Sequence, residues 1–170
     1  MKTNIVLFGF MGTGKTTVGR LLSRRLGFSL VDMDEIIESR EGRPISRIFA
    51  DNGEPYFRER ERALVVELAT KNGQVVATGG GVVLNPDNVA DFSRSGLAVC
   101  LKASPEAILA RVLRETHRPL LEEGDKARRI LKLLAARRAL YDAVPLGVDT
   151  SGLTPDEVAD RILAWWEADA

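Results

Sequence analysis

The sequence feature that most constrains the fold is a glycine-rich segment close to the N-terminus. Residues 9–16 read GFMGTGKT and fit the pattern G-x-x-x-x-G-K-[ST]. The segment follows the apolar run 5–8, which we expect to form a strand, and leads into an amphipathic run from Lys15 that indicates a helix. Glycine leaves no Cβ in the way, so backbone N–H groups can turn inward around a polyphosphate, and the helix N-terminus adds partial positive charge. The sequence therefore predicts an α/β fold that binds a nucleotide.

Two side chains of this loop carry the chemistry of phosphate binding. We expect Lys15 to reach the β- and γ-phosphates, and the Thr16 hydroxyl to ligate Mg²⁺. The pattern does not say which molecule receives the phosphate, so the acceptor has to be inferred from the remaining polar residues.

The rest of the chain alternates short apolar runs with longer amphipathic runs, and no linker divides its 170 residues. This alternation is typical of a parallel sheet covered by helices on both faces. We therefore predict one domain, residues 1–170, built on a central five-stranded parallel sheet. The expected strands are 5–8, 29–31, 75–77, 97–101 and 146–148. The expected helices begin near residues 15, 35, 46, 57, 86, 105, 125 and 155.

Composition excludes several classes of function. The 24 Lys and Arg residues balance 24 Asp and Glu residues, so no net charge favours nucleic acid or an anionic membrane. A single cysteine, Cys100, and a single histidine, His117, leave no disulfide framework and no multi-Cys or two-His metal site. The first apolar run is too short for a signal peptide or a membrane span. We expect a cytoplasmic protein with small-molecule partners.

Two carboxylates follow the second expected strand. In Asp32-Met33-Asp34, residues two apart on an extended segment point the same way, so both carboxylates are expected to face the ligand crevice at the carboxyl end of the sheet. One could anchor the water shell of a metal ion while the other accepts a hydroxyl proton. The alternative is an acidic pair that only stabilises the start of a helix.

Two further segments offer groups for an acceptor. Arg58 and Glu61 are neighbours on an expected helix, so the glutamate can orient the guanidinium, although a plain surface ion pair is an equally open interpretation. Three consecutive glycines, residues 79–81, follow the third strand and permit close approach of the backbone to a ligand.

Residues 115–124 form a polar stretch, punctuated by Pro119 and Gly124, between two expected helices. Its length suits a mobile lid, in which Arg118 is a candidate to swing over transferring phosphates. His117 could act as a base, but a lone histidine in a polar loop is more often only solvated.

In this order and spacing, the segments GFMGTGKTT, DMD, FRERE, TGGG, RPLL and ARRALY followed by VDT resemble the shikimate kinases over essentially the whole chain. The resemblance implies a P-loop kinase core like that of nucleoside monophosphate kinases, with a substrate-binding helical region at about 33–62 and a lid at about 115–124. It also implies transfer of the ATP γ-phosphate to the 3-hydroxyl of shikimate, a step toward chorismate and the aromatic amino acids.

The resemblance further assigns site residues. Those implied for ATP are Gly12, Thr13, Gly14, Lys15, Thr16, Thr17, Arg111, Arg118 and Pro155, the last within the adenine loop 150–155. Those implied for shikimate are Asp34, Arg58, Glu61, Gly79, Gly80, Gly81 and Arg137. Lys15, Asp34 and Arg118 are implied to be catalytic, and Mg²⁺ to bind Thr16 directly and Asp32 through water. Arg137 is preferred to Arg138 because it stands four residues before Tyr141, as the family pattern requires.

Rival functions fit the sequence less well. A kinase for another hydroxylated acid, such as gluconate, or for a nucleotide would share the phosphate loop, but the DMD segment, the triple glycine and the pair Arg58 and Arg137 together count against both. A sensing domain that kept the fold and lost turnover would lack Lys15, Asp34 or Arg118, and all three are present. Nothing in the sequence indicates an obligate oligomer, so we expect a monomer.

Overall fold

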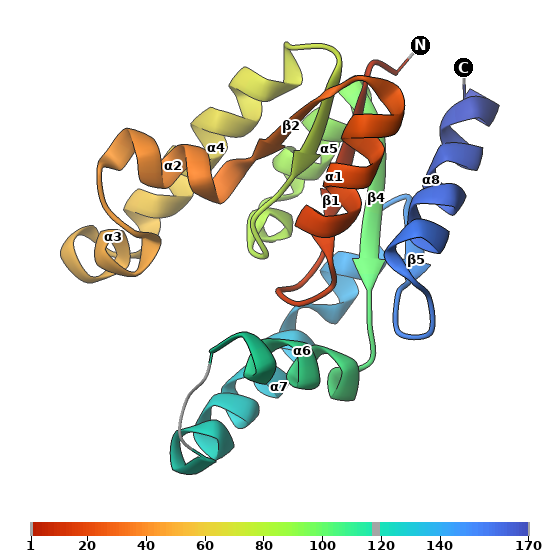
Figure 1. The fold of residues 1–170 in the computed structure, drawn as a ribbon. Helices are drawn as coiled ribbons and strands as arrows, with labels where there is room; N and C mark the ends of the chain where they lie inside the picture. Colours follow the sequence, from red (N-terminus) through yellow and green to blue (C-terminus); the bar gives the residue numbers. More distant parts are fainter. Residues whose placement is uncertain (1, 117–119, 170) are drawn as a thin grey trace.

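The computed structural model describes residues 2–116 and 120–169 (Figure 1). Within them, five parallel strands form one sheet in the order β2-β3-β1-β4-β5. The strands are β1 (Asn4–Phe8), β2 (Ser29–Asp32), β3 (Gln74–Ala77), β4 (Gly96–Lys102) and β5 (Leu146–Asp149). The predicted parallel α/β sheet is thereby confirmed. From β1 the chain first builds the half of the sheet that contains β2 and β3, and then the half that contains β4 and β5. The loop after β1 therefore lies at the point where the strand order reverses, which is where ligands bind in such folds.

Eight α-helices and one short 3₁₀ helix lie in the described residues. They are α1 (Lys15–Leu26), α2 (Met33–Glu41), α3 (Ile45–Asn52), α4 (Glu54–Ala69), η1 (Val82–Leu84), α5 (Pro86–Ser95), α6 (Pro105–Thr116), α7 (Leu120–Asp142) and α8 (Pro155–Asp169). In Figure 1, α2 and α3 project beyond one edge of the sheet, and α6 and α7 lie together beyond the carboxyl end of β4. No helix in the described part of the chain is both long and apolar enough to cross a bilayer.

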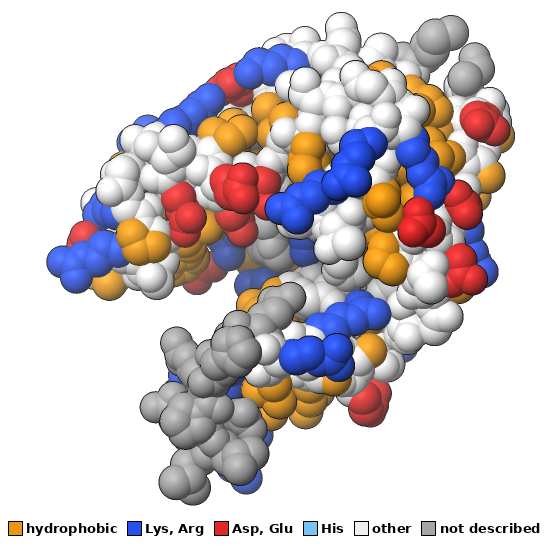
Figure 2. All heavy atoms as spheres, viewed as in Figure 1, with side chains coloured by type: hydrophobic (Ala, Val, Ile, Leu, Met, Phe, Trp, Pro, Cys, Tyr) orange, Lys and Arg blue, Asp and Glu red, His pale blue; other side chains and the backbone are white. Residues whose placement is uncertain are grey.

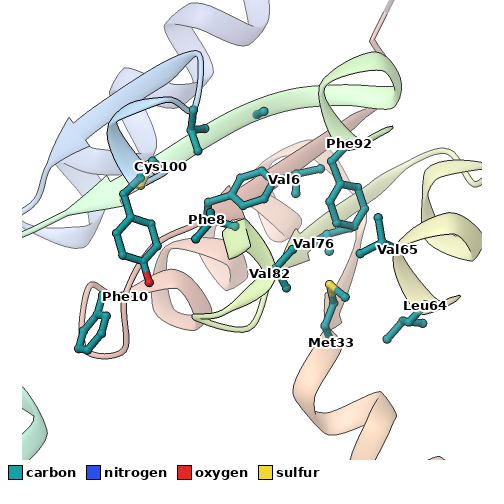
Figure 3. Close-up of a cluster of buried hydrophobic side chains, with 14 of the residues drawn as sticks. Val6, Phe8, Phe10, Met33, Leu64, Val65, Val76, Val82, Phe92 and Cys100 are labelled. Carbon is teal, nitrogen blue, oxygen red and sulfur yellow. The ribbon is translucent and has the colours of Figure 1, made fainter. Parts of the chain in front are cut away.

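Strand β1 shows how both faces of the sheet are covered. Val6 and Phe8 point into one apolar cluster, which α4, α5 and α7 help to build, and Figure 3 shows these side chains beside Phe92. Ile5 and Leu7 point into the opposite cluster, where α1 and α8 pack. These four apolar side chains of β1 are fully buried, as expected for the central strand of a parallel sheet.

Three helices begin two or more residues earlier than the sequence predicts. Helix α4 starts at Glu54 rather than near Phe57. Helix α2 starts at Met33 rather than near Glu35, because the Asp32 carboxylate accepts a hydrogen bond from the Glu35 N–H at 3.2 Å and caps the helix directly after β2. Helix α7 starts at Leu120 rather than near Asp125, and it runs through Gly124. A glycine inside a helix costs only about 1 kcal/mol, so it does not have to end one. The last five residues of the predicted lid, 120–124, are therefore helical.

Candidate active site

The phosphate loop joins β1 to α1 through three glycines with positive φ, namely Gly9, Gly12 and Gly14, at 146°, 76° and 96°. At Gly9 a Cβ would also lie 2.5 Å from the Leu101 carbonyl oxygen, so both backbone conformation and space require glycine there. The Thr13 hydroxyl donates to the Phe10 carbonyl at 2.8 Å and closes the turn. The loop is thus held in a wrapped conformation by its own residues.

Lys15 lies inside this loop. Its Nζ donates hydrogen bonds to the carbonyl oxygens of Gly9 at 2.5 Å and Phe10 at 2.9 Å. Burial lowers the pKa of Lys15 to about 8, and the nearby carboxylate of Asp34 opposes that change. An anionic phosphate would favour the charged form of the lysine and raise this pKa.

Both predicted carboxylates reach a common cavity, which we call the phosphate cavity. Its volume is about 270 Å³, and its lining includes Lys15, Thr16, Thr17, Asp32, Asp34 and Gly80. The sequence analysis expected Asp32 and Asp34 to point the same way because both lie on an extended segment. In the structure Asp34 already belongs to the first turn of α2, so an extended backbone is not the reason that both reach the cavity. Met33 between them is fully buried in the core, and Figure 3 shows it among apolar neighbours. Burying Met33 turns the flanking carboxylates to the cavity.

The two carboxylates have different surroundings. Asp32 caps α2 with one oxygen, and its other oxygen lies 3.4 Å from the Thr16 hydroxyl. Burial raises the pKa of Asp34, the charge of Asp32 raises it further, and Lys15 opposes both effects. Asp34 is therefore more basic than an ordinary carboxylate, which suits a group that accepts a proton.

The residues around Thr16 fit a magnesium ion that binds together with a nucleotide. Among the described residues, no group of three or more His, Cys, Asp or Glu side chains is arranged to hold a metal. Mg²⁺ bound with a nucleotide takes one or two protein oxygens and fills its remaining positions with phosphate oxygens and water. The Thr16 hydroxyl and the Asp32 carboxylate, side by side at the edge of the phosphate cavity, are such a pair.

A second cavity, the arginine cavity, has a volume of about 370 Å³ and is lined in part by Arg58, Glu61 and Gly81. Arg58 donates to Glu61 at 2.9 Å and to Glu54 at 3.2 Å, and its guanidinium lies 5.2 Å from the centre of the Phe57 ring. Glu61 is buried, and burial raises its pKa against the opposing effect of Arg58. The pair is therefore not a plain surface ion pair, because one partner is removed from solvent.

Arg137 approaches the same place from α7. Its guanidinium interacts electrostatically with buried Glu61, and its Nη1 would lie 3.8 Å from a Cβ on Gly80. The adjacent Arg138 lies elsewhere, in an apolar cavity next to Asp142. The structure therefore brings Arg137, and not Arg138, to the triple glycine.

The three glycines of the triplet differ in how much space a side chain would have at each position. A Cβ at Gly79 would lie 2.7 Å from an oxygen of Asp34, and one at Gly81 would clash with the Arg58 guanidinium. A Cβ at Gly80 would be no closer than 3.8 Å to any protein atom outside its chain neighbours. Two of the glycines thus make room for functional side chains, and Gly80 alone leaves open space facing the phosphate cavity.

The surface is hollowed at this site. Figure 2 shows a deep notch between the part of the molecule that carries α2 and α3 and the part that carries α6 and α7, with Lys or Arg side chains visible inside it. A polyphosphate and a small anionic acceptor would both be attracted to such a notch.

Comparison with known proteins identifies the family. The family model for shikimate kinase matches residues 11–167. A shikimate kinase of Thermodesulfovibrio yellowstonii is 46% identical over 164 residues, which are 96% of this chain and 95% of that protein. The chain belongs to the shikimate kinase family. It is accordingly an enzyme of the kinase class, as the sequence resemblance implied.

Solved structures of shikimate kinases share the fold. The Acinetobacter baumannii shikimate kinase, described as a complex with shikimate, superposes with a TM-score of 0.88 at 35% identity, covering 99% of this chain and 95% of that one. The Aquifex aeolicus shikimate kinase gives a TM-score of 0.78 at 36% identity, covering 98% and 97%. The α/β P-loop kinase fold predicted for this shikimate kinase family member is thereby confirmed.

Arg111 has structural partners that the family resemblance did not specify. Its guanidinium donates to the Gly12 carbonyl at 2.9 Å and to the Thr150 hydroxyl and carbonyl at 3.1 and 3.2 Å. The side chain therefore ties the phosphate loop to the loop after β5, where the adenine is expected. Pro155 is the first residue of α8, at the end of that loop.

Some functional residues lie outside the described part of the chain, and others have contacts that the sequence did not predict. Arg118, predicted to act from the lid, lies outside the described residues, as does His117. The family resemblance gave Thr150 only as the first residue of the adenine loop, although its buried hydroxyl contacts the Thr13 and Lys102 carbonyl oxygens. The sequence analysis used Tyr141 only to set the register of Arg137, although the Tyr141 hydroxyl donates to the Gly80 carbonyl at 2.6 Å. A threonine at a strand end and a tyrosine late in a helix carry no local signal for such contacts.

Proposed function

We propose that this protein transfers the γ-phosphoryl group of ATP to the 3-hydroxyl of shikimate, giving shikimate 3-phosphate and ADP on the route to chorismate and the aromatic amino acids. The observation that carries the proposal is the convergence of Arg58 and Arg137, from two different helices, on the glycine triplet beside the phosphate cavity. The relative from Acinetobacter baumannii was solved in complex with shikimate, which supports the same acceptor here.

The guanidinium groups at the arginine cavity suit an anionic acceptor. Arg58 and Arg137 face one buried carboxylate, Glu61, and the second carboxylate that Arg58 contacts, Glu54, is more than half exposed, so solvent screens its charge. A planar substrate carboxylate can accept paired hydrogen bonds from arginine, which a lysine cannot provide. Glu61 then serves to hold both arginines in place rather than to touch the acceptor.

Asp34 and Lys15 supply the groups for transfer. In the proposed reaction the acceptor oxygen forms a bond to the γ-phosphorus as the bond to the ADP oxygen breaks, and the hydroxyl proton passes to the Asp34 carboxylate. Lys15 offsets the charge on the β- and γ-phosphates. Mg²⁺, held by Thr16 and through water by Asp32, would add further charge neutralisation when bound.

Other assignments stay predictions. We propose that Gly12, Thr13, Gly14 and Thr17 bind the phosphates with Lys15 and Thr16, and that Arg111 and Pro155 flank the adenine. Arg118 is proposed to close over the phosphates from a lid within residues 115–124, and the domain to act as a cytoplasmic monomer with no nucleic acid or membrane partner. Ligand-dependent hydrogen exchange across residues 115–124 tests the lid.

A coupled assay of ADP release separates the candidate functions. With ATP and Mg²⁺, we expect ADP release that depends on added shikimate and is absent with gluconate or with nucleoside monophosphates. Release with gluconate or a nucleotide instead would overturn the acceptor assignment. Binding of shikimate without any ADP release would favour a sensing domain, provided that the same preparation binds ATP.

A further inference from the structure

Tyr141 lies where three parts of the site meet. It is almost fully buried in the last turns of α7, one turn after Arg137. Its hydroxyl donates to the Gly80 carbonyl at 2.6 Å, and its ring packs edge-on against Phe10 of the phosphate loop, with 6.4 Å between ring centroids. The Arg137 guanidinium, one turn earlier on α7, lies close enough to the same hydroxyl to lower the pKa of Tyr141 against the effect of burial. One phenol thus contacts the phosphate loop and the glycine triplet, and it lies beside an acceptor arginine.

The Gly80–Gly81 peptide needs an anchor. Gly80 lines the phosphate cavity and Gly81 lines the arginine cavity, so the peptide that joins them forms part of the wall between the two. Within residues 2–116 and 120–169, neither the Gly80 nor the Gly81 N–H has a hydrogen-bond partner. Consecutive glycines rotate more freely than any other pair of residues. Without a restraint, this peptide plane could turn and carry its N–H away from a ligand.

The Tyr141 hydroxyl supplies that restraint. A trans peptide is planar, and its carbonyl oxygen and the following N–H point in opposite directions. A hydrogen bond from Tyr141 to the Gly80 oxygen therefore directs the Gly81 N–H away from α7. Because the Arg137 guanidinium lies beside the same hydroxyl, one group is placed to set both the peptide plane and the guanidinium.

We propose that Tyr141 is a positioning residue, which holds the Gly80–Gly81 peptide and the Arg137 guanidinium in the orientation required for transfer. The inference rests on the proposed function, in which Arg137 binds the shikimate carboxylate. Tyr141 contacts neither the reacting hydroxyl nor the phosphates in this proposal, and its effect passes through the two groups that it holds.

The test is Tyr141→Phe, which removes the hydroxyl and keeps the ring against Phe10. We expect kcat/KM for shikimate to fall about ten-fold or more, the effect expected when a buried acceptor, here the Gly80 carbonyl, loses its hydrogen-bond partner, with a lower kcat and a weaker shikimate Kd. The Kd for ADP should stay within about two-fold, because the phosphate loop keeps its own hydrogen bonds. A general loss of folding would weaken both ligands and would be seen in the ADP measurement.

Tyr56→Phe is the matched control, since Tyr56 is the other of the two tyrosines in the chain. Its hydroxyl also makes part-buried polar contacts, to the two Glu41 carboxylate oxygens at 3.0 and 3.1 Å, and Tyr56 lines neither cavity. We expect Tyr56→Phe to lower the melting temperature without changing kcat/KM. If Tyr141→Phe behaves in the same way, with wild-type kinetics, the positioning role is overturned.

Arg137→Met separates failure of this inference from failure of the proposed function. Loss of shikimate binding in Arg137→Met, with normal shikimate binding and turnover in Tyr141→Phe, would leave the function standing and overturn the role of Tyr141. Normal shikimate binding in Arg137→Met would instead overturn the assignment of the acceptor arginine.

Discussion

Arg58 donates a hydrogen bond to Glu61, three residues further along α4, and the carboxylate that receives it is only 2% exposed. A buried carboxylate is costly without a cationic partner, so the two side chains depend on each other. Glu61 also faces Arg137 from α7. The pair therefore links α4, whose first half lies within the expected substrate-binding region 33–62, to α7 across the site.

Arg58→Lys tests this relationship. A lysine lacks the planar guanidinium, so it cannot contact Glu61, Glu54 and a substrate carboxylate at the same time. We therefore expect shikimate binding to weaken by about ten-fold or more. Calorimetry should show ATP binding nearly unchanged. Arg60→Lys, at an exposed position on the same helix, is the control and should alter neither ligand. Equal losses for both ligands in Arg58→Lys would indicate a purely structural pair.

Lys15 provides a prediction on pH. Because its pKa is lowered to about 8, roughly half of the empty protein carries a neutral lysine at pH 8, and bound phosphates raise that pKa. Nucleotide binding at pH 8 should therefore take up roughly half a proton, and the uptake should vanish near pH 6, where the lysine is already charged. Calorimetry of ADP binding in buffers of different ionisation enthalpy measures it.

Lys15→Met is both the control for proton uptake and a test of catalysis. The variant should show no uptake from this site at pH 8. It should also lose transfer activity by about 100-fold or more, because a cation beside the polyphosphate is missing in the transition state. Near-normal turnover in a variant shown to be folded by circular dichroism contradicts the kinase mechanism.

The two carboxylates should respond differently to amide substitution. Asp34→Asn should reduce kcat severely at every Mg²⁺ concentration, because an amide cannot accept the hydroxyl proton. Asp32→Asn keeps an oxygen that can cap α2, so it should fold normally and need more Mg²⁺, with part of its activity restored at high metal. A Mg²⁺ titration of both variants decides the matter, and identical curves refute the division of roles.

Gly79→Ala and Gly80→Ala form a matched pair, since neither glycine has positive φ. An alanine at 79 meets Asp34 at 2.7 Å and must displace it, so we expect lower thermal stability together with lower kcat. An alanine at 80 meets no protein atom closer than 3.8 Å, so we expect a normal melting temperature with weaker ligand binding. Normal binding in Gly80→Ala would mean that no ligand approaches this position.

Residues near one another in the chain determined the phosphate loop and the sheet. The loop depends on glycines that adopt positive φ and on a lysine and a threonine at its end, all within residues 9–16. Strand β1 is apolar at every central position because helices cover both sheet faces. Arg58 and Glu61 are likewise local, one helical turn apart, so their contact followed from helix geometry. In each case the physical cause acts over a few residues, and the sequence by itself was sufficient.

Only the tertiary structure decided how distant residues meet. Whether Arg137 or Arg138 faces the glycine triplet depends on how α7 packs against the sheet, and so does the contact of Tyr141 with Gly80. The glycine triplet looked uniform in sequence, yet Asp34 and Arg58 occupy the space beside two of its members and leave Gly80 open. These contacts join segments that are far apart in the chain, and they arise only when the apolar faces of the helices are buried together, which no local pattern of residues encodes.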